Sequence, residues 1–284
     1  MAKVIHSIEV LRASLNTHRL NQQRIGFVPT MGALHEGHKQ LIKTAREHSD
    51  IVVVSIYVNP TQFGPNEDFE DYPRQLDQDA ALIDGIADYI FAPTDDVMYP
   101  LEESTSIQLN VGHQNTVMDG PVRPGHFNGV VTVVNKLFNI VQPDVACFGK
   151  KDAQQLAIIQ TMVNDFHMNI EIIGVDIIRN AQGLAESSRN VYLSENELKN
   201  APILYNTLTG AKQLIKEGTT DVNRVKEYIE KRIQGESLGQ LDALDILTYP
   251  TLKHIDTIES TDESIVIAIA VKYDKARLID NIIM

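Results

Sequence analysis

The sequence predicts an α/β fold in which a parallel sheet fills the N-terminal part and a smaller α+β unit follows. Short apolar runs rich in β-branched residues recur over the first 180 residues, and amphipathic helical patterns lie between them. Strands that alternate with helices are typical of a parallel sheet. After about residue 180 the order becomes helices followed by strands, which indicates a separate unit.

The strands expected in the first part are continuously apolar, as strands covered by helices on both faces are. They are RIGFVPT (24–30), IVVVSIYV (51–58), YIFAP (89–93), VACFG (145–149) and IEIIGVDIIR (170–179). Helices are expected between them at 37–48, 127–141 and 152–166. In the first of these, Leu41, Ile42 and Ala45 share one side of the helix.

In the second part, helices are expected at 193–218 and 221–234, followed by strands at 241–249, 264–273 and 276–284. Ser194 lies three residues before Glu197, which is the spacing of a helix N-terminal capping box. We place the boundary near 178–186, which divides the chain into a domain of residues 1–180 and a smaller domain of residues 181–284.

Composition narrows the classes of partner. The 284 residues carry a formal net charge of −13, which disfavours nucleic acid and anionic membranes as partners but leaves small anionic substrates possible. Cys147 is the single cysteine, so no internal disulfide can form, and its apolar neighbours predict a buried side chain. We expect no signal peptide and no transmembrane helix, because long apolar runs are lacking, and hence a cytoplasmic location.

The segment PTMGALHEGH (29–38) lies where the first long strand should end and a helix should begin. Glycines at 32 and 37 allow close approach of the backbone to a ligand, and a helix N-terminus favours phosphate. In an open parallel sheet, ligands bind at the carboxyl ends of the strands. These features predict a phosphate site, although the segment is neither a P-loop nor a G-x-G-x-x-G fingerprint.

Two other interpretations of the histidines in this segment remain. A helical zinc site of the H-E-x-x-H kind would need histidine at position 39, where the sequence has Lys39, and no third ligand cluster is evident. His35 and His38 could instead be core histidines with satisfied hydrogen bonds.

The segment HEGH has the H-x-G-H form of the nucleotidylyltransferase superfamily. It stands in order with VSIYVNPTQFG (54–64), RPGHFNGVVTVV (123–134), FGKKDAQQ (148–155) and ESSRNVYL (186–193). Together these motifs resemble those of the pantothenate synthetase (pantoate–β-alanine ligase) family, and the terminal ARLIDNI resembles the family's ending. The resemblance implies a Rossmann-like N-terminal domain and a homodimer formed through it.

The implied reaction is the ATP-dependent condensation of (R)-pantoate with β-alanine to pantothenate, AMP and pyrophosphate. It proceeds through a pantoyl adenylate, with ATP as substrate and Mg²⁺ as cofactor. The resemblance implies six catalytic residues, namely His35, His38, Lys151, Ser187, Ser188 and Arg189. It implies His38 as the proton donor, which we interpret as a hydrogen-bond donor to the α-phosphate or the departing pyrophosphate.

The remaining site residues are also implied by the resemblance. The ATP-binding set is Pro29, Thr30, Met31, Gly32, Ala33, Leu34, His35, Glu36, Gly37, His38, Gly149, Lys150, Lys151, Asp152, Ile178, Glu186, Ser187, Ser188 and Arg189. Pantoate would be bound by Gln62, Gln155, Asn59, Val133 and Val134, and β-alanine by Gln62. Tyr72, Arg123 and His126 are secondary candidates, and no residue is assigned to Mg²⁺.

Two positions depart from the family pattern. Glu186 replaces the apolar residue that commonly precedes Ser-Ser-Arg, and we expect its carboxylate to point away from phosphate. Lys150 stands where Glu or Gln is common, which leaves two adjacent lysines as phosphate-binding candidates. We prefer Lys151 by its place in the motif.

Three alternatives remain at this stage. Another nucleotidylyltransferase would share HEGH without the pantoate motifs. A class I aminoacyl-tRNA synthetase is disfavoured, because the chain is short and acidic and has no evident RNA-binding module. A nucleotide-binding sensor without catalysis is disfavoured, because the histidines, Lys151 and Ser187 occur together.

Overall fold

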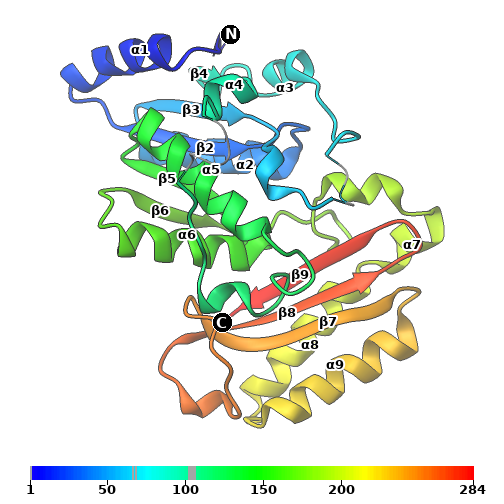
Figure 1. The fold of residues 1–284 in the computed structure, drawn as a ribbon. Helices are drawn as coiled ribbons and strands as arrows, with labels where there is room; N and C mark the ends of the chain where they lie inside the picture. The colour runs from blue at the N-terminus through cyan, green and yellow to red at the C-terminus, as the bar shows by residue number, and fades with distance from the viewer. Residues whose placement is uncertain (1, 66, 68, 102–106) are drawn as a thin grey trace. The chain divides into compact units, whose positions relative to one another are not determined.

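The structure, a computed structural model, describes residues 2–65, 67, 69–101 and 107–284 (Figure 1). It divides into two compact units. The first unit comprises the described residues within 1–112, 122–150 and 158–176. The second comprises 113–121, 151–157 and 177–284. The domain division expected at residue 180 stays a prediction.

The first unit is built on a six-stranded sheet in the order β1-β4-β3-β2-β5-β6, and every neighbouring pair is parallel. This confirms the predicted parallel α/β fold. The strands are β1 Lys3–Ile5, β2 Ile25–Thr30, β3 Ile51–Ile56, β4 Tyr89–Phe91, β5 Val145–Gly149 and β6 Glu171–Val175. The last strand is shorter than the expected 170–179, because the chain leaves the sheet after Val175 and soon enters a separate hairpin.

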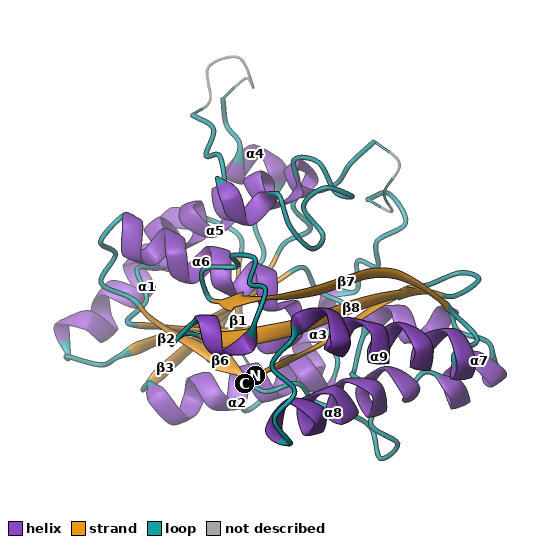
Figure 2. Ribbon diagram, turned by 90° about the horizontal axis from the view of Figure 1, so that it is seen from below, coloured by secondary structure: helices purple, strands orange, loops and turns teal. Residues whose placement is uncertain are grey.

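Helices cover both faces of this sheet, as the continuously apolar strands require. Ile42 and Ala45 of α2 (Glu36–His48) pack on one face, and Phe138 of α5 (His126–Val141) contacts the rings of Phe27 and Phe148 on the other. Figure 2 shows α2 and α5 on opposite sides of the strands. The helices are α1 Ile8–Leu20, α2 Glu36–His48, α3 Leu76–Leu82, α4 Asp95–Met98, α5 His126–Val141 and α6 Ala153–Asp165, and the start of α6 belongs to the second unit.

Cys147 lies in β5 and is 1% exposed, and its burial raises the pKa of the thiol to about 12. The predicted role as a small buried hydrophobic residue is therefore confirmed.

The strand order reverses at β2, which lies between β3 and β5. Chain connections leave the sheet in opposite directions at such a point, and ligands bind there at the carboxyl ends of the strands. PTMGALHEGH runs from the last two residues of β2 into α2, the Asn59–Gln62 turn follows β3, and Lys150 follows β5. The fold of the first unit thus brings these three segments to one edge of one sheet.

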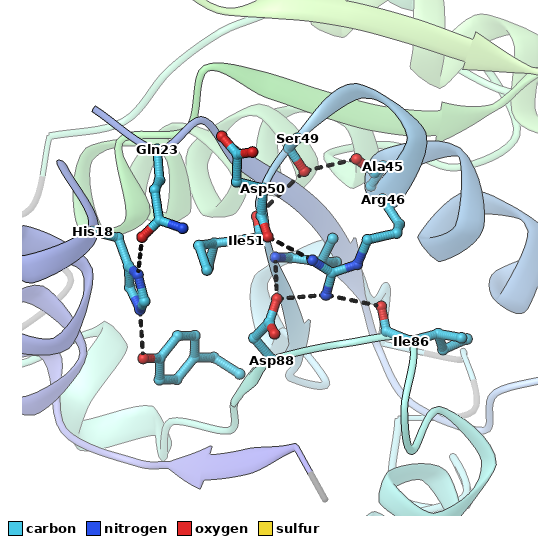
Figure 3. Close-up of polar contacts among 11 residues, drawn as sticks. His18, Gln23, Ala45, Arg46, Ser49, Asp50, Ile51, Ile86 and Asp88 are labelled. Atoms are coloured by element: carbon cyan, nitrogen blue, oxygen red, sulfur yellow. Dashed lines mark hydrogen bonds and ion pairs between the residues drawn. The ribbon is translucent and has the colours of Figure 1, made fainter. Parts of the chain in front are cut away.

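The amino edge of the sheet is held by three aspartates, Asp50, Asp88 and Asp144, which directly precede β3, β4 and β5. Each carboxylate accepts a 2.7 Å hydrogen bond from a backbone amide at or near the start of the neighbouring strand, from Arg24, Val52 and Ile25, respectively. Figure 3 shows Arg46 extending along this edge to Asp88, 2.5 Å away, and to the backbone carbonyls of Asp50 and Ile86.

The second unit contains a three-stranded antiparallel sheet in the order β7-β8-β9, formed by Gln240–Tyr249, Ser264–Lys272 and Arg277–Ile283. Helices α8 (Ile203–Lys216) and α9 (Val222–Glu236) supply apolar side chains to a core against one face of this sheet (Figure 1). The predicted α+β character of the C-terminal part is therefore confirmed.

The single helix expected over 193–218 is wrong. The structure has α7 (Glu195–Asn200) and α8, separated at Ala201 and Pro202, because proline lacks the amide that would continue α7. The predicted capping box is confirmed: the Ser194 amide donates to the Glu197 carboxylate at 2.8 Å, and the Glu197 amide donates to the Ser194 hydroxyl at 3.4 Å. Among the described residues, no helix is both long and apolar enough to cross a membrane.

The amino edge gives a stability prediction. Asp88→Ala should lower the free energy of unfolding by about 1–3 kcal/mol, because the Val52 amide and Arg46 lose a charged acceptor. Urea denaturation measures this change, with Asp165→Ala as the control, since Asp165 is an exposed carboxylate at the end of α6. An equal effect of the two substitutions would show that the edge contacts contribute nothing.

Candidate active site

The loop between β2 and α2 is shaped by a buried carboxylate. Asp79 of α3 is 1% exposed and accepts hydrogen bonds from the amides of Ala33 at 3.0 Å and Leu34 at 2.8 Å. Gly32 and Ala33 both have positive φ, and a Cβ on Gly32 would lie 3.0 Å from Asp79 Oδ2. The carboxylate thus stabilises a backbone conformation that few residues adopt.

The two histidines of the H-x-G-H turn cap the first turn of α2. His35 Nδ1 accepts from the Gly37 amide at 3.1 Å, and His38 Nδ1 accepts from the His35 amide at 3.3 Å. The ring centroids are 4.2 Å apart. A neutral imidazole whose Nδ1 accepts carries its hydrogen on Nε2. Both rings are therefore set as Nε2–H donors.

This arrangement changes the expected use of the helix terminus. The sequence suggested that backbone amides at the start of α2 meet phosphate, but the Gly37 amide is bonded to the His35 ring. The imidazoles are therefore further donors that this turn can offer to an anion, and the expected use of its other amides stays a prediction. Glu36, the acidic residue between them, is paired with Lys39 at 2.9 Å, and this hydrogen bond lowers the pKa of the Glu36 carboxyl.

Gln62 lies at the end of the turn after β3, and a buried residue holds the orientation of its side-chain amide. Asn59 is 1% exposed and donates from Nδ2 to Gln62 Oε1 at 3.1 Å, while its own Oδ1 accepts from the Tyr99 hydroxyl at 2.7 Å. Gln62 Nε2 lies 2.9 Å from Sδ of Met31, which belongs to the loop between β2 and α2. Asn59, expected to contact pantoate, is thus engaged in orienting Gln62.

A second chain of contacts fixes the Gln62 backbone. His126 Nδ1 lies 2.8 Å from Gln62 O, and His126 Nε2 lies 2.9 Å from Arg123 Nη1. Because arginine can only donate, Nε2 accepts and Nδ1–H donates to the carbonyl. Arg123 also binds Glu67 through two hydrogen bonds of 2.8 and 2.7 Å, which lower the pKa of the Glu67 carboxyl.

Helix α5 lies unusually close to the same turn. A Cβ on Gly129 would lie 2.3 Å from Thr61 O and 2.7 Å from Gln62 Cα, so only glycine fits there. Val133 and Val134 follow on the same helix and are 6% and 4% exposed. They are core residues in the structure, and a role as an apolar wall for pantoate stays a prediction.

The two lysines after β5 differ in their contacts. Lys150 Nζ is 2.6 Å from Asp176, just beyond β6, so its charge is partly neutralised. Lys151, which opens a segment of the second unit, is 3.8 Å from Asp152, a longer and weaker pairing. The contacts favour Lys151 over Lys150 for binding an anion.

Of the two glutamines that follow, Gln154 is 4% exposed and donates to the carbonyls of Gln114 and Val117 at 2.7 and 2.8 Å. Gln155 is only half-buried. Gln154 is therefore structural, which is consistent with Gln155 as the ligand candidate.

In the second unit, Ser187, Ser188 and Arg189 follow a short hairpin. The Glu186 amide donates to Ile178 O at 2.9 Å, and Ser187 caps the 3-10 turn Ser188–Tyr192 by accepting from the Arg189 amide at 3.2 Å. Glu186 is half-buried. Its expected orientation away from phosphate stays a prediction.

The structure thus brings the predicted residues together in two sets. The first unit holds the H-x-G-H turn and the Gln62 turn, and the second holds Lys151 and the Ser187–Arg189 segment. Sequence reasoning missed Asp79 and Glu67, because acidic residues in the segment 67–79 resemble a solvated loop. Helical periodicity is the signal that could have distinguished the buried Asp79 from its exposed neighbour Asp77, because Asp79 lies three residues after Leu76 and four before Ile83, on the apolar face of α3.

Among the described residues, no three His, Cys, Asp or Glu side chains converge in a way that could hold a metal ion. The described residues therefore do not form a dedicated Mg²⁺ site from protein ligands alone. Mg²⁺ that accompanies ATP is commonly held by phosphate oxygens and water, with few protein ligands.

A parallel sheet with an H-x-G-H turn at the strand where its order reverses defines an α/β protein whose turn has the sequence form of the nucleotidylyltransferase superfamily. The comparisons with known proteins are more specific. The family model described as pantoate-beta-alanine ligase matches residues 3–283. The chain belongs to the pantoate–β-alanine ligase family.

Similar proteins support this assignment over the whole chain. Pantothenate synthetase from Staphylococcus epidermidis is 51% identical, covering 100% of this chain and 98% of its own. Pantothenate synthetase from Staphylococcus haemolyticus is 48% identical over 100% of this chain and 99% of its own. A crystal structure of the enzyme from Thermus thermophilus matches with a TM-score of 0.89 and 39% identity, covering 99% and 98% of the two chains.

The structure of pantoate-beta-alanine ligase from Francisella tularensis matches with a TM-score of 0.76 and 32% identity, covering 99% of this chain and 97% of its own. That protein was crystallised as a complex with beta-gamma ATP and beta-alanine.

The close approach of α5 to the Gln62 turn gives a prediction. Gly129→Ala should raise the KM for pantoate by about tenfold or more, because the new methyl group displaces the backbone that carries Gln62. Steady-state kinetics would show this. The matched control is Gly235→Ala in α9, where an added Cβ meets nothing within 4 Å. An unchanged KM in Gly129→Ala would contradict the assignment of Gln62 to pantoate.

Proposed function

We propose that this chain joins pantoate to β-alanine at the expense of ATP, releasing AMP and pyrophosphate, and that pantoyl adenylate is the intermediate. The observation that carries the proposal is the H-x-G-H turn, in which both imidazoles are set as Nε2–H donors. In the same unit, the oriented amide of Gln62 contacts Met31 in the loop that leads to this turn. The Francisella relative, bound to an ATP compound and β-alanine, supports the same substrates here.

The chemistry requires two displacements. A carboxylate oxygen of pantoate attacks the α-phosphorus of ATP, and the bond from that phosphorus to the pyrophosphate oxygen breaks. The β-alanine amine then attacks the acyl carbon, the bond to AMP breaks, and the amine gives up a proton. Both steps depend chiefly on orientation and on stabilisation of the charge that develops on phosphate.

His35 and His38 are assigned to the first displacement. Their Nε2–H groups would donate to the α-phosphate or to the departing pyrophosphate, where negative charge increases. Because Nδ1 of each ring is held by a backbone amide, little reorganisation is needed during the reaction. His38 thus acts as a hydrogen-bond donor, and complete proton transfer to pyrophosphate is unnecessary.

Pantoate is assigned to Gln62 and Gln155, with Val133 and Val134 as the apolar wall for its methyl groups. Since Asn59 accepts or donates at each of its polar side-chain atoms within the protein, we assign it to orienting Gln62. Gln62 Nε2 then presents a donor to the carboxylate or a hydroxyl of pantoate, and Gln62 is also the candidate for β-alanine.

The triphosphate is assigned to Lys151 and to Ser187, Ser188 and Arg189, all in the second unit. Lys151 is preferred because Lys150 is paired with Asp176. Mg²⁺ would enter with ATP. We also propose a homodimer, from the family resemblance, and a cytoplasmic location, from the lack of an internal disulfide.

The function is tested by isotope exchange. With ATP, Mg²⁺ and pantoate, but without β-alanine, labelled pyrophosphate should enter ATP, because the adenylate forms reversibly before the amine is needed. Omitting pantoate is the control and should abolish exchange. Exchange that strictly required β-alanine would refute the adenylate intermediate.

Substitutions of His38 and Gln62 should impair different steps of the reaction. His38→Ala should slow adenylate formation by about 10²–10³ with little change in pantoate binding, as expected for a donor that acts in the transition state. Gln62→Ala should weaken pantoate binding, because a carboxylate or hydroxyl oxygen is left poorly paired. Single-turnover measurement of each half-reaction separates these effects.

Supplied with pantoyl adenylate, the His38→Ala variant should transfer the acyl group to β-alanine at a near-normal rate. Equal damage to both half-reactions would mean that His38 organises the whole site instead.

A further inference from the structure

The terminal motif ARLIDNI forms β9, an edge strand of the second unit's sheet. It carries two adjacent polar residues that are almost fully buried, Asp280 at 3% and Asn281 at 4% exposure. Adjacent strand residues point to opposite faces of a sheet. Buried polar side chains are costly unless they are hydrogen-bonded, so their partners reveal what this strand holds.

On one face, Asp280 binds Arg179 through two hydrogen bonds of 2.7 and 2.8 Å. The Arg179 guanidinium also lies 3.8 Å from the centre of the Tyr205 ring of α8 and donates to Gly183 O at 3.1 Å. Arg179 pairs with Ala185 in an antiparallel bridge, at the base of a hairpin. Asp280 therefore fixes the hairpin that leads directly into the Ser187–Arg189 segment.

On the other face, Asn281 donates from Nδ2 to the backbone carbonyl of Lys151 at 2.8 Å. The start of α6 packs on this same face, where Ala153 and Ala157 join the apolar cluster of Val266 and Ala268. Asn281 thus holds the backbone of the lysine that the contacts favour for anion binding.

We propose that Asp280 and Asn281 are positioning residues, which fix the two triphosphate-binding segments of the second unit to a single strand. Neither residue is assigned a contact with substrate. The inference rests on the proposed function, in which Lys151 and Ser187–Arg189 bind the triphosphate. Without the hydrogen bonds made by Asp280 and Asn281, ATP binding would have to order these two segments, and the entropic cost would weaken the affinity for ATP.

Two variants of nearly unchanged side-chain size test the proposal in the full-length protein. Asp280→Asn removes the charge that binds Arg179, and Asn281→Leu removes the donor to Lys151 O. The matched control is Asp242→Asn in β7, which disrupts ion pairs of 2.7 and 2.6 Å to Arg277 and Lys272 in the same sheet. Neither of these two partners belongs to a triphosphate-binding segment.

The readouts are the KM values for ATP and pantoate in pyrophosphate exchange, together with the unfolding midpoint in urea. We expect both variants to raise the KM for ATP by roughly fivefold to tenfold, with less than about a twofold change for pantoate. Asp242→Asn should lose stability and keep both KM values. A merely structural role lowers the amount of active enzyme without changing either KM.

Arg179→Met/Asp280→Asn covers the case in which Asp280→Asn fails to fold. The double variant leaves no unpaired guanidinium, so it should regain stability while the KM for ATP stays raised. Recovery of the ATP KM together with stability would overturn the proposal.

Lys151→Ala, measured in parallel, separates the assignment of Lys151 to the triphosphate from the positioning role of Asp280 and Asn281. It should raise the KM for ATP; if it does not, the assignment of Lys151 fails and the proposal fails with it. If Lys151→Ala weakens ATP binding while Asp280→Asn and Asn281→Leu behave like Asp242→Asn, only the positioning role is overturned.

Discussion

The reciprocal capping of α2 by His35 and His38 is the interaction on which the proposed chemistry depends. Each Nδ1 accepts a backbone amide, so each Nε2 carries a hydrogen that can be donated. The helix would otherwise leave amides at its first turn for the ligand. The two rings accept hydrogen bonds from two of these amides and present further donors that are fixed to the helix. A preorganised donor needs little reorganisation when charge develops nearby.

Buried side chains hold the segments that carry the candidate site residues in the same way, by hydrogen bonds to them. Asp79 holds the loop before His35, Asn59 orients the Gln62 side chain, and His126 holds the Gln62 carbonyl. All three are at least nine-tenths buried. A buried polar group with satisfied partners fixes a geometry firmly, because breaking the contact leaves an unpaired group away from water. In the first unit, a network of buried polar side chains therefore holds the loop before His35 and the turn that carries Gln62.

Much of the fold was predictable because hydrophobic periodicity dominates it. Strands β2, β3 and β5 begin and end within two residues of the expected runs, since these runs are buried on both faces. Helix α1 was missed although Leu11 and Leu15 face the core one turn apart and Ser7 caps the start. Pro202 was overlooked, so α7 and α8 were merged into one helix.

The candidate site was predictable as a set of motifs, but its internal contacts were not. The resemblance identified the turns that carry His38, Gln62 and Lys151, because those are local in sequence. The partners of these turns are distant: Asp79 is 45 residues from Leu34, and Asn281 is 130 residues from Lys151. One sequence carries no information on such pairs until the backbone is folded. By charge alone Asp79 would be assigned to solvent, whereas the structure places it in the interior.

The tautomers of the two histidines can be measured directly. In protein labelled with ¹⁵N at histidine, with His35→Gln and His38→Gln used for assignment, the ring nitrogen shifts distinguish Nε2–H from Nδ1–H. We predict that both rings are Nε2–H in the free protein, and that adding MgATP shifts the Nε2 resonances while Nδ1 stays an acceptor. An Nδ1–H ring at either position would contradict the capping geometry and the donor role derived from it.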